Sequence, residues 1–337
     1  FMKNTSIDNL KLRLSYGMLG NNTCPTYAYQ ATYETGSLNY PFGGTLNSAI
    51  AQTALANEYL HWETTKSANL GIDLSILRNR LTAEIDFYNR ITSDVLYAAP
   101  IYATLGEKTP PTQNLCGVTN RGTEITLSWQ DKIKKFQYGI SINGSRNYNV
   151  VSKYKGQLKE GWIENSDGTR SWQTNIGDVT TQVGTERRLL EGKIINEFYL
   201  LNVYSGNGTY FNGDGTVNIT GGPKDGMIRT ENDMKWLQAM VKSGYSFHPN
   251  YTIGTQANKS GIYYGDYIYA DENGDGIYGN DYDKTFQDKS LMPKIFYGIQ
   301  ANASWKGLDF SMSWMGAAGG AIYWRYLGLN SFETREL

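Results

Sequence analysis

Residues 69–88, NLGIDLSILRNRLTAEIDFY, decide the fold because they hold two runs of alternating apolar and polar residues around a short link. The apolar members are Leu70, Ile72, Leu74 and Ile76 before the link, and Leu81, Ala83, Ile85 and Phe87 after it. A period of two residues places them all on one face of a β-strand. The link, residues 77–80, is short enough for a tight turn between antiparallel strands. The stretch therefore predicts a β-hairpin with one apolar and one polar face.

The same alternation occurs in five other runs along the chain. They are residues 10–18, 123–130, 136–144, 295–305 and 308–314. Short links at residues 131–135 and 306–307 predict antiparallel pairing of 123–130 with 136–144 and of 295–305 with 308–316. Several runs approach the ~9–11 residues with which a tilted strand crosses a bilayer. We therefore expect seven long strands, six of them in hairpins.

The connections between these strands are long, in contrast to the links within the hairpins. They cover residues 20–66, 90–118 and 149–293. Short turns on one side and long loops on the other are typical of outer-membrane β-barrels, with the short turns on the periplasmic side. Trp129, Phe136, Trp305 and Phe310 stand beside two of the short links, which suits the aromatic girdle of a membrane interface. A soluble β-sandwich also has alternating strands, and its core would hold the same rings.

In a barrel, the two faces of the predicted strands meet different surroundings. The apolar face is expected to meet lipid through Leu70, Ile72, Ile85, Phe87, Ile125, Leu127, Ile140, Ile299 and Phe310. The polar face is expected to line the lumen with Lys11, Arg13, Asp73, Glu84, Asp86 and Glu124. Such lumen charges can contact a plug, tune selectivity or simply be solvated. In a soluble sandwich they would only be solvated.

Composition narrows the classes of function. The 337 residues hold 31 Lys and Arg against 32 Asp and Glu, so charge does not favour nucleic acid and we expect no nucleic-acid partner. The sequence has no run of 18 apolar residues that would predict a transmembrane helix. The 26 Tyr and 37 Gly favour strands and turns over helices.

The sequence lacks familiar catalytic motifs. His61 and His248, its only histidines, stand outside any zinc-binding pattern. There is no G-x-S-x-G elbow for a serine nucleophile and no G-x-x-x-x-G-K-[ST] phosphate loop. We expect that the protein is not an enzyme and requires no cofactor.

One helix is expected within the longest connection. Thr230 and Asp233 have the spacing of a capped helix start, which predicts an amphipathic helix over residues 231–242. Its apolar face holds Met234, Leu237, Met240 and Val241. We interpret the helix as an element that packs an external loop.

Six groups of residues, in order along the chain, resemble the motifs of one transporter family. They are 10–21 (LKLRLSYGMLGN); 57–64 with 69–73 and 86–88; 120–124 (NRGTE); 226–230 (GMIRT); 265–276; and 293–298 with 306–310. The first is similar to a family strand that reads LKLRxSYGxxGN, and the third to the pattern NxGxE at the head of a strand. By the order and spacing of these motifs, nearly the whole chain resembles the SusC/RagA-type TonB-dependent outer-membrane transporters.

The resemblance implies an all-β fold, an antiparallel transmembrane β-barrel segment with long extracellular loops, from a plugged barrel of ~22 strands. Residues 1–337 are then a partial TonB-dependent receptor β-barrel domain from the carboxy-proximal side, and the plug domain is not present in this chain. Such a piece is expected neither to close a barrel nor to transport by itself.

The resemblance further implies nutrient import, of oligosaccharide or oligopeptide, across the bacterial outer membrane. The expected partners are a SusD-like surface lipoprotein that acts as a lid, TonB through the plug domain, and outer-membrane lipid. The competing hypothesis is a soluble or surface carbohydrate-binding or adhesive β-sandwich protein. A plug domain with a TonB box encoded upstream would favour transport.

Tyrosines are frequent in the predicted outer loops. A rigid ring with a polar tip suits the surface of a sugar or a peptide. Loops packed by their own aromatics would have the same composition. The tyrosines of these loops are Tyr27, Tyr29, Tyr33, Tyr40, Tyr204, Tyr210, Tyr263, Tyr264, Tyr267 and Tyr269. The candidate ligand-binding residues are Tyr27, Tyr29, Tyr263 and Tyr264.

Residues 271–283 predict either a structural calcium site or a metal-free turn. The D-x-N-x-D-G start supplies side-chain oxygens at its first, third and fifth positions, and Gly276 lets the next carbonyl turn inward. Tyr282 stands where the calcium-loop pattern has a glutamate, so a carboxylate beside it would have to replace that ligand. Asp, Asn and Gly in this order also form turns through bonds to their own backbone. The candidate metal ligands are Asp271, Asn273, Asp275, Ile277, Asp281 and Asp283.

Cys24 and Cys116 are the only cysteines, and neither has a partner at metal-ligand spacing. Both fall in predicted outer loops, where an oxidising environment permits a disulfide. The sequence leaves open whether they are bonded.

Overall fold

The computed structural model describes residues 6–98, 111–248 and 261–323. The chain forms two compact units. The first holds Phe1–Gln157, Leu189–Ile195 and Ser290–Leu337, and the second holds Leu158–Arg188 and Asn196–Lys289. Within the described ranges, no helix is both long enough and apolar enough to cross a membrane.

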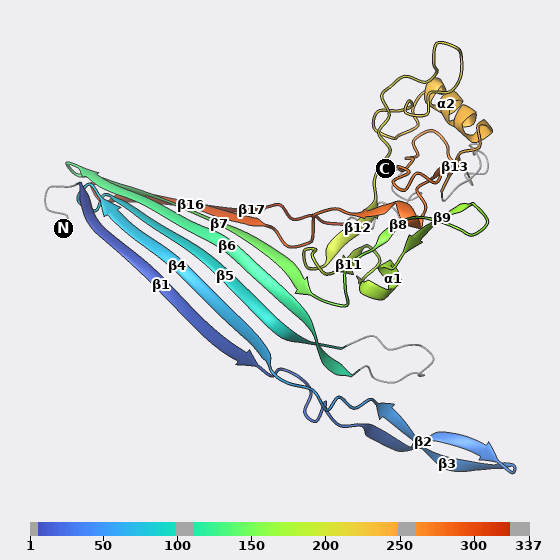
Figure 1. The fold of residues 1–337 in the computed structure, drawn as a ribbon. Helices are drawn as coiled ribbons and strands as arrows, with labels where there is room; N and C mark the ends of the chain where they lie inside the picture. Colours follow the sequence, from blue (N-terminus) through green and yellow to red (C-terminus); the bar gives the residue numbers. More distant parts are fainter. Residues whose placement is uncertain (1–5, 99–110, 249–260, 324–337) are drawn as a thin grey trace. The chain divides into compact units, whose positions relative to one another are not determined.

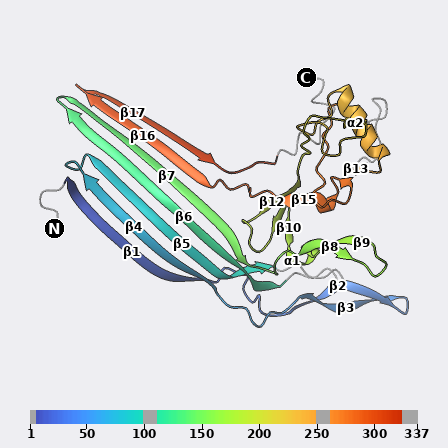
Figure 2. The same cartoon turned by 45° about the horizontal axis from the view of Figure 1, so that its top comes forward.

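A seven-stranded antiparallel sheet dominates the first unit (Figures 1 and 2). Its strands, in spatial order, are β1 (Ile7–Asn21), β4 (Glu63–Ile76), β5 (Leu81–Ala98), β6 (Thr112–Ile133), β7 (Phe136–Lys153), β16 (Ile295–Trp305) and β17 (Leu308–Ala318). These are the seven strands that the alternating runs predict. Every pair of neighbours in the sheet is antiparallel.

The three predicted hairpins are confirmed in register. Leu70 pairs with Phe87 in β4–β5, Leu127 with Ile142 in β6–β7, and Ile299 with Trp314 in β16–β17. Their short turns lie at the same end of the sheet (Figure 1). The β6–β7 turn is tighter than the predicted link 131–135, because the ladder continues to the pair Ile133–Phe136.

The predicted loop over residues 90–118 was wrong at both ends. Residues 90–98 belong to β5 and residues 112–118 to β6, and the ladder between them includes the pair Arg90–Asn120. Alternation does not reveal this extension, because residues 89–93 are mostly polar on both faces. The predicted loop 20–66 contains a separate hairpin, β2 (Thr32–Phe42) with β3 (Thr45–Ala54).

The sheet has one apolar and one polar face, as the alternation predicts. Paired positions continue the apolar face across all seven strands, from Leu14 opposite Leu70 in β1–β4 to Ala303 opposite Phe310 in β16–β17. Leu14 is 82% exposed and Phe310 is 55% exposed. Within the described part of the first unit, no second layer therefore buries this face. A soluble β-sandwich would bury it, so the sandwich hypothesis was wrong for this sheet.

The second unit is built from short elements. They are β8 (Glu160–Glu164), β9 (Arg170–Thr174), α1 (Ile176–Val179), β10 (Thr181–Val183), β11 (Arg187–Leu189), β12 (Glu197–Leu201), α2 (Glu231–Lys242), β13 (Ser246–Phe247), β14 (Ile277–Tyr278), the 3-10 helix η2 (Asp281–Asp283) and β15 (Lys284–Phe286). Strands β10, β11, β12 and β15 form one sheet, β8 pairs with β9, and β13 lies parallel to β14.

Helix α2 has the predicted bounds, and its start has the predicted cap. The Thr230 hydroxyl accepts the Asp233 N–H at 3.2 Å, and the Asp233 carboxylate accepts the Thr230 N–H at 2.7 Å. Burial raises the pKa of Asp233, but hydrogen bonds from Thr230, Tyr210 and Arg229 outweigh it and hold this pKa below its ordinary value.

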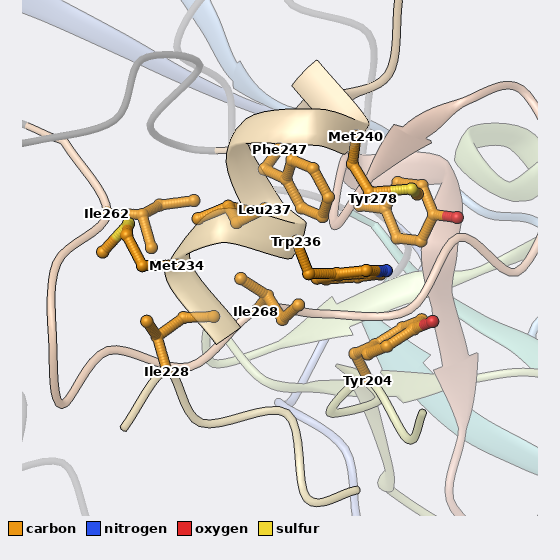
Figure 3. Packing of buried hydrophobic residues seen from close by; sticks show 10 residues of the cluster. All are labelled: Tyr204, Ile228, Met234, Trp236, Leu237, Met240, Phe247, Ile262, Ile268 and Tyr278. Carbon is orange, nitrogen blue, oxygen red and sulfur yellow. The ribbon is translucent and has the colours of Figure 1, made fainter. Parts of the chain in front are cut away.

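The core of the second unit surrounds one face of α2 (Figure 3). Trp236 is fully buried and donates its indole N–H to the Asn218 carbonyl at 2.8 Å. Gly222 packs so closely on this ring that an added Cβ would lie 2.8 Å from Trp236 Cε2. The buried members are Tyr204, Ile228, Met234, Trp236, Leu237, Met240, Phe247, Ile262, Ile268 and Tyr278. The helical period misses Trp236, and the predicted Val241 lies only at the border of the core.

Candidate functional site

The polar face of the large sheet carries a three-stranded charge cluster. Arg13 of β1 donates to Asp73 of β4 through Nε and Nη2, at 3.0 and 2.7 Å from Oδ1. The same guanidinium reaches Asp86 of β5, with Nη1 at 3.0 Å from Oδ1 and Nη2 at 2.9 Å from Oδ2. One arginine therefore joins three adjacent strands by charge-assisted hydrogen bonds.

Gly71 makes this reach across β4 possible. It pairs with Arg13 on one side and with Asp86 on the other. An added Cβ at Gly71 would lie 2.6 Å from the guanidinium carbon of Arg13, closer than any side chain tolerates. The sequence prediction places Arg13, Asp73 and Asp86 on one face but misses Gly71. The signal was present, since glycine occupies a polar-face position inside an otherwise regular strand.

A shallow polar depression of about 610 Å³ adjoins the cluster. The Tyr88 hydroxyl donates to Asn147 at 3.1 Å across it. Asn69 contributes a buried side-chain oxygen that has no hydrogen-bond partner within the described ranges. The lining residues are Arg13, Asn69, Asp86, Tyr88, Arg90, Asn120, Glu124 and Asn147. Such a surface offers both donors and acceptors to a polar partner.

The candidate ligand-binding tyrosines form two ring pairs, one in each unit. Tyr27 and Tyr29 have ring centroids 6.4 Å apart and are 64% and 47% exposed. Tyr263 and Tyr264 form an edge-to-face pair at 5.1 Å. Their contact with ligand stays a prediction. By contrast, Tyr204 packs in the core against Trp236, as the loop-packing alternative expects.

The loop 271–283 is closed by hydrogen bonds from its own backbone. Asp271 accepts the N–H groups of Gly274, Asp275 and Gly276 at 2.7–3.1 Å. Asp283 is fully buried and accepts four further N–H groups, those of Glu272, Asn273, Gly279 and Asn280.

Only part of the candidate ligand set converges in this loop. Asn273 and Asp275 lie close together, with Asn273 Nδ2 donating to Asp275 Oδ2 at 3.2 Å. Asp281 instead pairs with Lys284 at 2.6 Å. Among the described residues, no cluster of three or more His, Cys, Asp or Glu side chains has the geometry of a metal site. Calcium binding stays a prediction for this loop, and so does a role for Ile277.

Cys116 was placed wrongly in a loop. It is a buried residue of β6, opposite Val95 of β5. Neither Cys24 nor Cys116 is bonded, so the structure does not support a disulfide.

Comparison with known proteins identifies a family and several relatives. The family model described as "TonB dependent receptor-like, beta-barrel" matches residues 5–258. The TonB-dependent receptor SusC of Bacteroides thetaiotaomicron is 30% identical over 233 residues, which cover 64% of this chain and 22% of SusC. The TonB-dependent receptor P26 of Formosa agariphila is 26% identical over 330 residues, which cover 96% of this chain and 27% of that receptor.

Solved structures show the same fold. The RagAB peptide importer in its open-open state aligns with a TM-score of 0.59 at 20% identity, over 95% of this chain and 27% of that chain. In its closed-closed state the TM-score is again 0.59, at 20% identity, over 95% of this chain and 28% of that chain. This chain thus spans about a quarter of the length of the proteins that it matches.

An antiparallel sheet of long strands, apolar on one face and charged on the other, defines part of the wall of a membrane β-barrel. The chain belongs to the TonB-dependent receptor β-barrel family. The resemblance to SusC/RagA-type transporters is thereby confirmed. Members of this family are outer-membrane β-barrel proteins. In such a wall the apolar face meets lipid and the polar face lines the lumen.

Proposed function

We propose that this chain forms part of the barrel of a TonB-dependent importer that takes up oligosaccharide or oligopeptide. The observation that carries the proposal is the Arg13 cluster with its polar depression, on the face of the sheet opposite the exposed apolar side chains. A barrel wall that carries fixed charges into its lumen suits passage of a polar solute or contact with a plug domain.

We further propose that the whole transporter works with a SusD-like surface lipoprotein and with TonB. The identity to SusC and the fold shared with RagAB, which is named as a peptide importer, support this assignment. Solute capture at the surface would then precede TonB-driven entry through the lumen. Transport, rather than catalysis, is the activity that the name of the RagAB peptide importer suggests.

Uptake by whole cells tests this function. The gene of the full-length protein is deleted and restored, and uptake of fluorescent neutral oligosaccharides and oligopeptides is measured with and without a protonophore. We expect at least one solute class to need the gene and the energised inner membrane. Uptake that is unchanged by deletion for every solute, or a protein recovered without membranes, would overturn the proposal.

A variant in the charge cluster links the structure to the function. Arg13→Gln leaves Asp73 and Asp86 as neighbouring carboxylates without their shared cation, so we expect lower uptake at an unchanged protein level in the membrane. The matched control is Lys132→Gln, on the same face of the sheet but in β6, near the β6–β7 turn and outside the depression. Equal uptake by the two variants would separate the cluster from transport.

A further inference from the structure

The second unit contains a cavity that the sequence prediction missed. Its volume is about 280 Å³, just below the ~300–1,000 Å³ usual for small-molecule pockets, so it has room for one ring and not for an oligomer. Its lining comes from five segments: β8, β9 with α1, β10 and β11 with their turn, β12, and η2 with β15. The lining residues are Glu160, Trp172, Thr174, Ile176, Gln182, Thr185, Glu186, Arg188, Tyr199, Asp281, Tyr282 and Lys284.

Aromatic rings provide the apolar part of the lining. Trp172 lies in β9 and packs edge-to-face on Trp162 of β8, with centroids 5.8 Å apart. Tyr199 is buried and packs on Phe286 at 4.8 Å. Burial raises the pKa of Tyr199 to about 12, so its hydroxyl stays neutral at ordinary pH and both donates and accepts.

The cations of the cavity already have partners. Arg188 donates from Nη1 to the Thr180 hydroxyl at 3.0 Å, and its guanidinium lies 5.0 Å from the centre of the Tyr199 ring. Lys284 pairs with Asp281 at 2.6 Å. Both are fixed in place and keep further N–H groups for a ligand.

The two glutamates are less engaged. Glu160 accepts a long hydrogen bond of 3.4 Å from the Thr174 hydroxyl, and Glu186 accepts one from the Thr185 hydroxyl. Within the described ranges neither forms a salt bridge. Strong acceptors, strong donors and aromatic rings therefore share the wall of one small cavity.

We propose that this cavity binds a single pyranose ring of a neutral oligosaccharide. Each sugar hydroxyl both donates and accepts, so it can use the carboxylates and the cations at once, while the C–H face of the ring packs on an aromatic side chain. The lining carries both signs of charge, with Glu160, Glu186 and Asp281 beside Arg188 and Lys284, so neither a basic nor an acidic peptide side chain would be matched by all of it. The mixed lining thus favours a polyol. This inference rests on the proposed importer function and names its substrate class.

The cavity wall is braced before any ligand arrives. The Trp162 indole donates to the Asn273 carbonyl at 2.8 Å, which ties the β8–β9 hairpin to the loop 271–283. Asp283, the last residue of η2, holds that loop closed by accepting its backbone N–H groups, and its neighbours Asp281 and Tyr282 line the cavity. A preformed pocket loses little conformational entropy when it binds.

Calorimetric titration of the detergent-solubilised full-length transporter tests the proposal. The probes are defined neutral tri- to hexasaccharides of glucose, galactose, mannose and xylose, with acidic and basic pentapeptides beside them. We expect at least one saccharide series to bind. Glu160→Gln should weaken its affinity about tenfold, because a hydrogen bond to a charged acceptor becomes one to a neutral amide.

The matched control is Glu164→Gln, an exposed carboxylate of the same strand that does not line the cavity. It should leave the affinity within about twofold. Trp172→Ala should also weaken binding about tenfold, and the conservative Trp172→Phe should restore part of it, which separates a lost stacking surface from a misfolded hairpin.

The outcomes distinguish this inference from the proposed function. Saccharide affinity that is equal in the wild type, Glu160→Gln and Trp172→Ala would overturn the cavity assignment while uptake by cells still supports an importer. A transporter that binds only peptides would overturn the sugar assignment, and weaker peptide binding in Glu160→Gln would identify a peptide subsite. Loss of the importer function itself would appear in the uptake experiment, with no solute entering.

Discussion

The sheet of the first unit and the core of the second treat apolar side chains in opposite ways. In the sheet, Leu127 is 42% exposed and Ile142 is 45% exposed, although both belong to interior strands that are paired on both sides. Around α2, Trp236, Leu237 and Met240 have no exposed surface. The sheet is thus folded for an apolar solvent, whereas the second unit buries its apolar surface by itself, as a protein in water must.

The two units therefore obtain their stability from different sources. In lipid, the sheet gains no stability from burying its apolar face against another layer. Its stability therefore depends on its backbone hydrogen bonds and on the match between its apolar face and the bilayer. The second unit depends on a packed core and on capped turns. Substitutions in one unit should therefore leave the stability of the other unit unchanged.

Trp236→Ala should have the largest effect. Removal of a fully buried indole leaves a cavity and takes away one of the two N–H donors to the Asn218 carbonyl, which costs about 3–5 kcal/mol of local stability. Hydrogen exchange of the full-length transporter should speed up in peptides over residues 228–247 and stay unchanged in β4–β7. Lys235→Ala, at the neighbouring exposed position, is the control. Faster exchange in the sheet as well would show that the units are not energetically separate.

Leu127→Arg should have the next largest effect, and only in lipid. A charge on the lipid face of β6, in register with Ile299 near the middle of β16, should destabilise the barrel by about 2–4 kcal/mol. Thr126→Arg places the same charge at the same depth on the polar face and should change stability little. Urea titration of the full-length barrel in lipid vesicles measures both. Equal midpoints for the two variants would contradict the assignment of the faces.

Loss of the helix cap should have a smaller effect. Thr230→Ala removes the oxygen that accepts the Asp233 N–H and should destabilise α2 by about 0.5–2 kcal/mol, whereas Thr230→Ser should keep the wild-type stability. Hydrogen exchange in the first turn of α2 reports the difference. If the serine variant exchanges as fast as the alanine variant, the cap is not what holds this helix.

Calcium should have the smallest effect. At a calcium concentration equal to the dissociation constant, binding stabilises by only about 0.4 kcal/mol. Calorimetry of the full-length transporter, with Asp271→Asn and Asp275→Asn as controls, should detect an ion whose loss speeds exchange over residues 271–283. If no calcium binds at calcium concentrations up to about 10 mM, above the dissociation constants of extracellular calcium modules, the loop is a metal-free turn.

The sheet could be predicted from the sequence because its signal is local and periodic. Leu70, Ile72 and Phe87 reveal their strands and their face by spacing alone. The ends of β5 and β6 could not be predicted, because their polar residues carry no period and only backbone pairing, as between Arg90 and Asn120, holds them. Helix α2 could also be predicted from a local signal, because the spacing of Thr230 and Asp233 marks its start.

The candidate sites were less predictable, since they depend on contacts between distant segments. Arg13, Asp73 and Asp86 fall on one face by alternation, but the bridge between them needs the empty space at Gly71. The cavity beside Trp172 joins five segments between residues 160 and 284, and no spacing within one segment indicates it. Asp283 could be nominated as a metal ligand, yet its four backbone N–H partners appear only once the loop is closed.

The pairing of β7 with β16 has a consequence for the order of assembly. The three hairpins close through turns of a few residues, whereas β7 can find β16 only after residues 154–294 have been brought round. Each doubling of a flexible loop adds about 0.6 kcal/mol of closure entropy, so this loop costs roughly 3 kcal/mol more to close than a four-residue turn. The penalty falls if the second unit has already folded and shortened the span. The β16–β17 hairpin should therefore be the last part of the sheet to join, and its arrival should be rate-limiting for the wall.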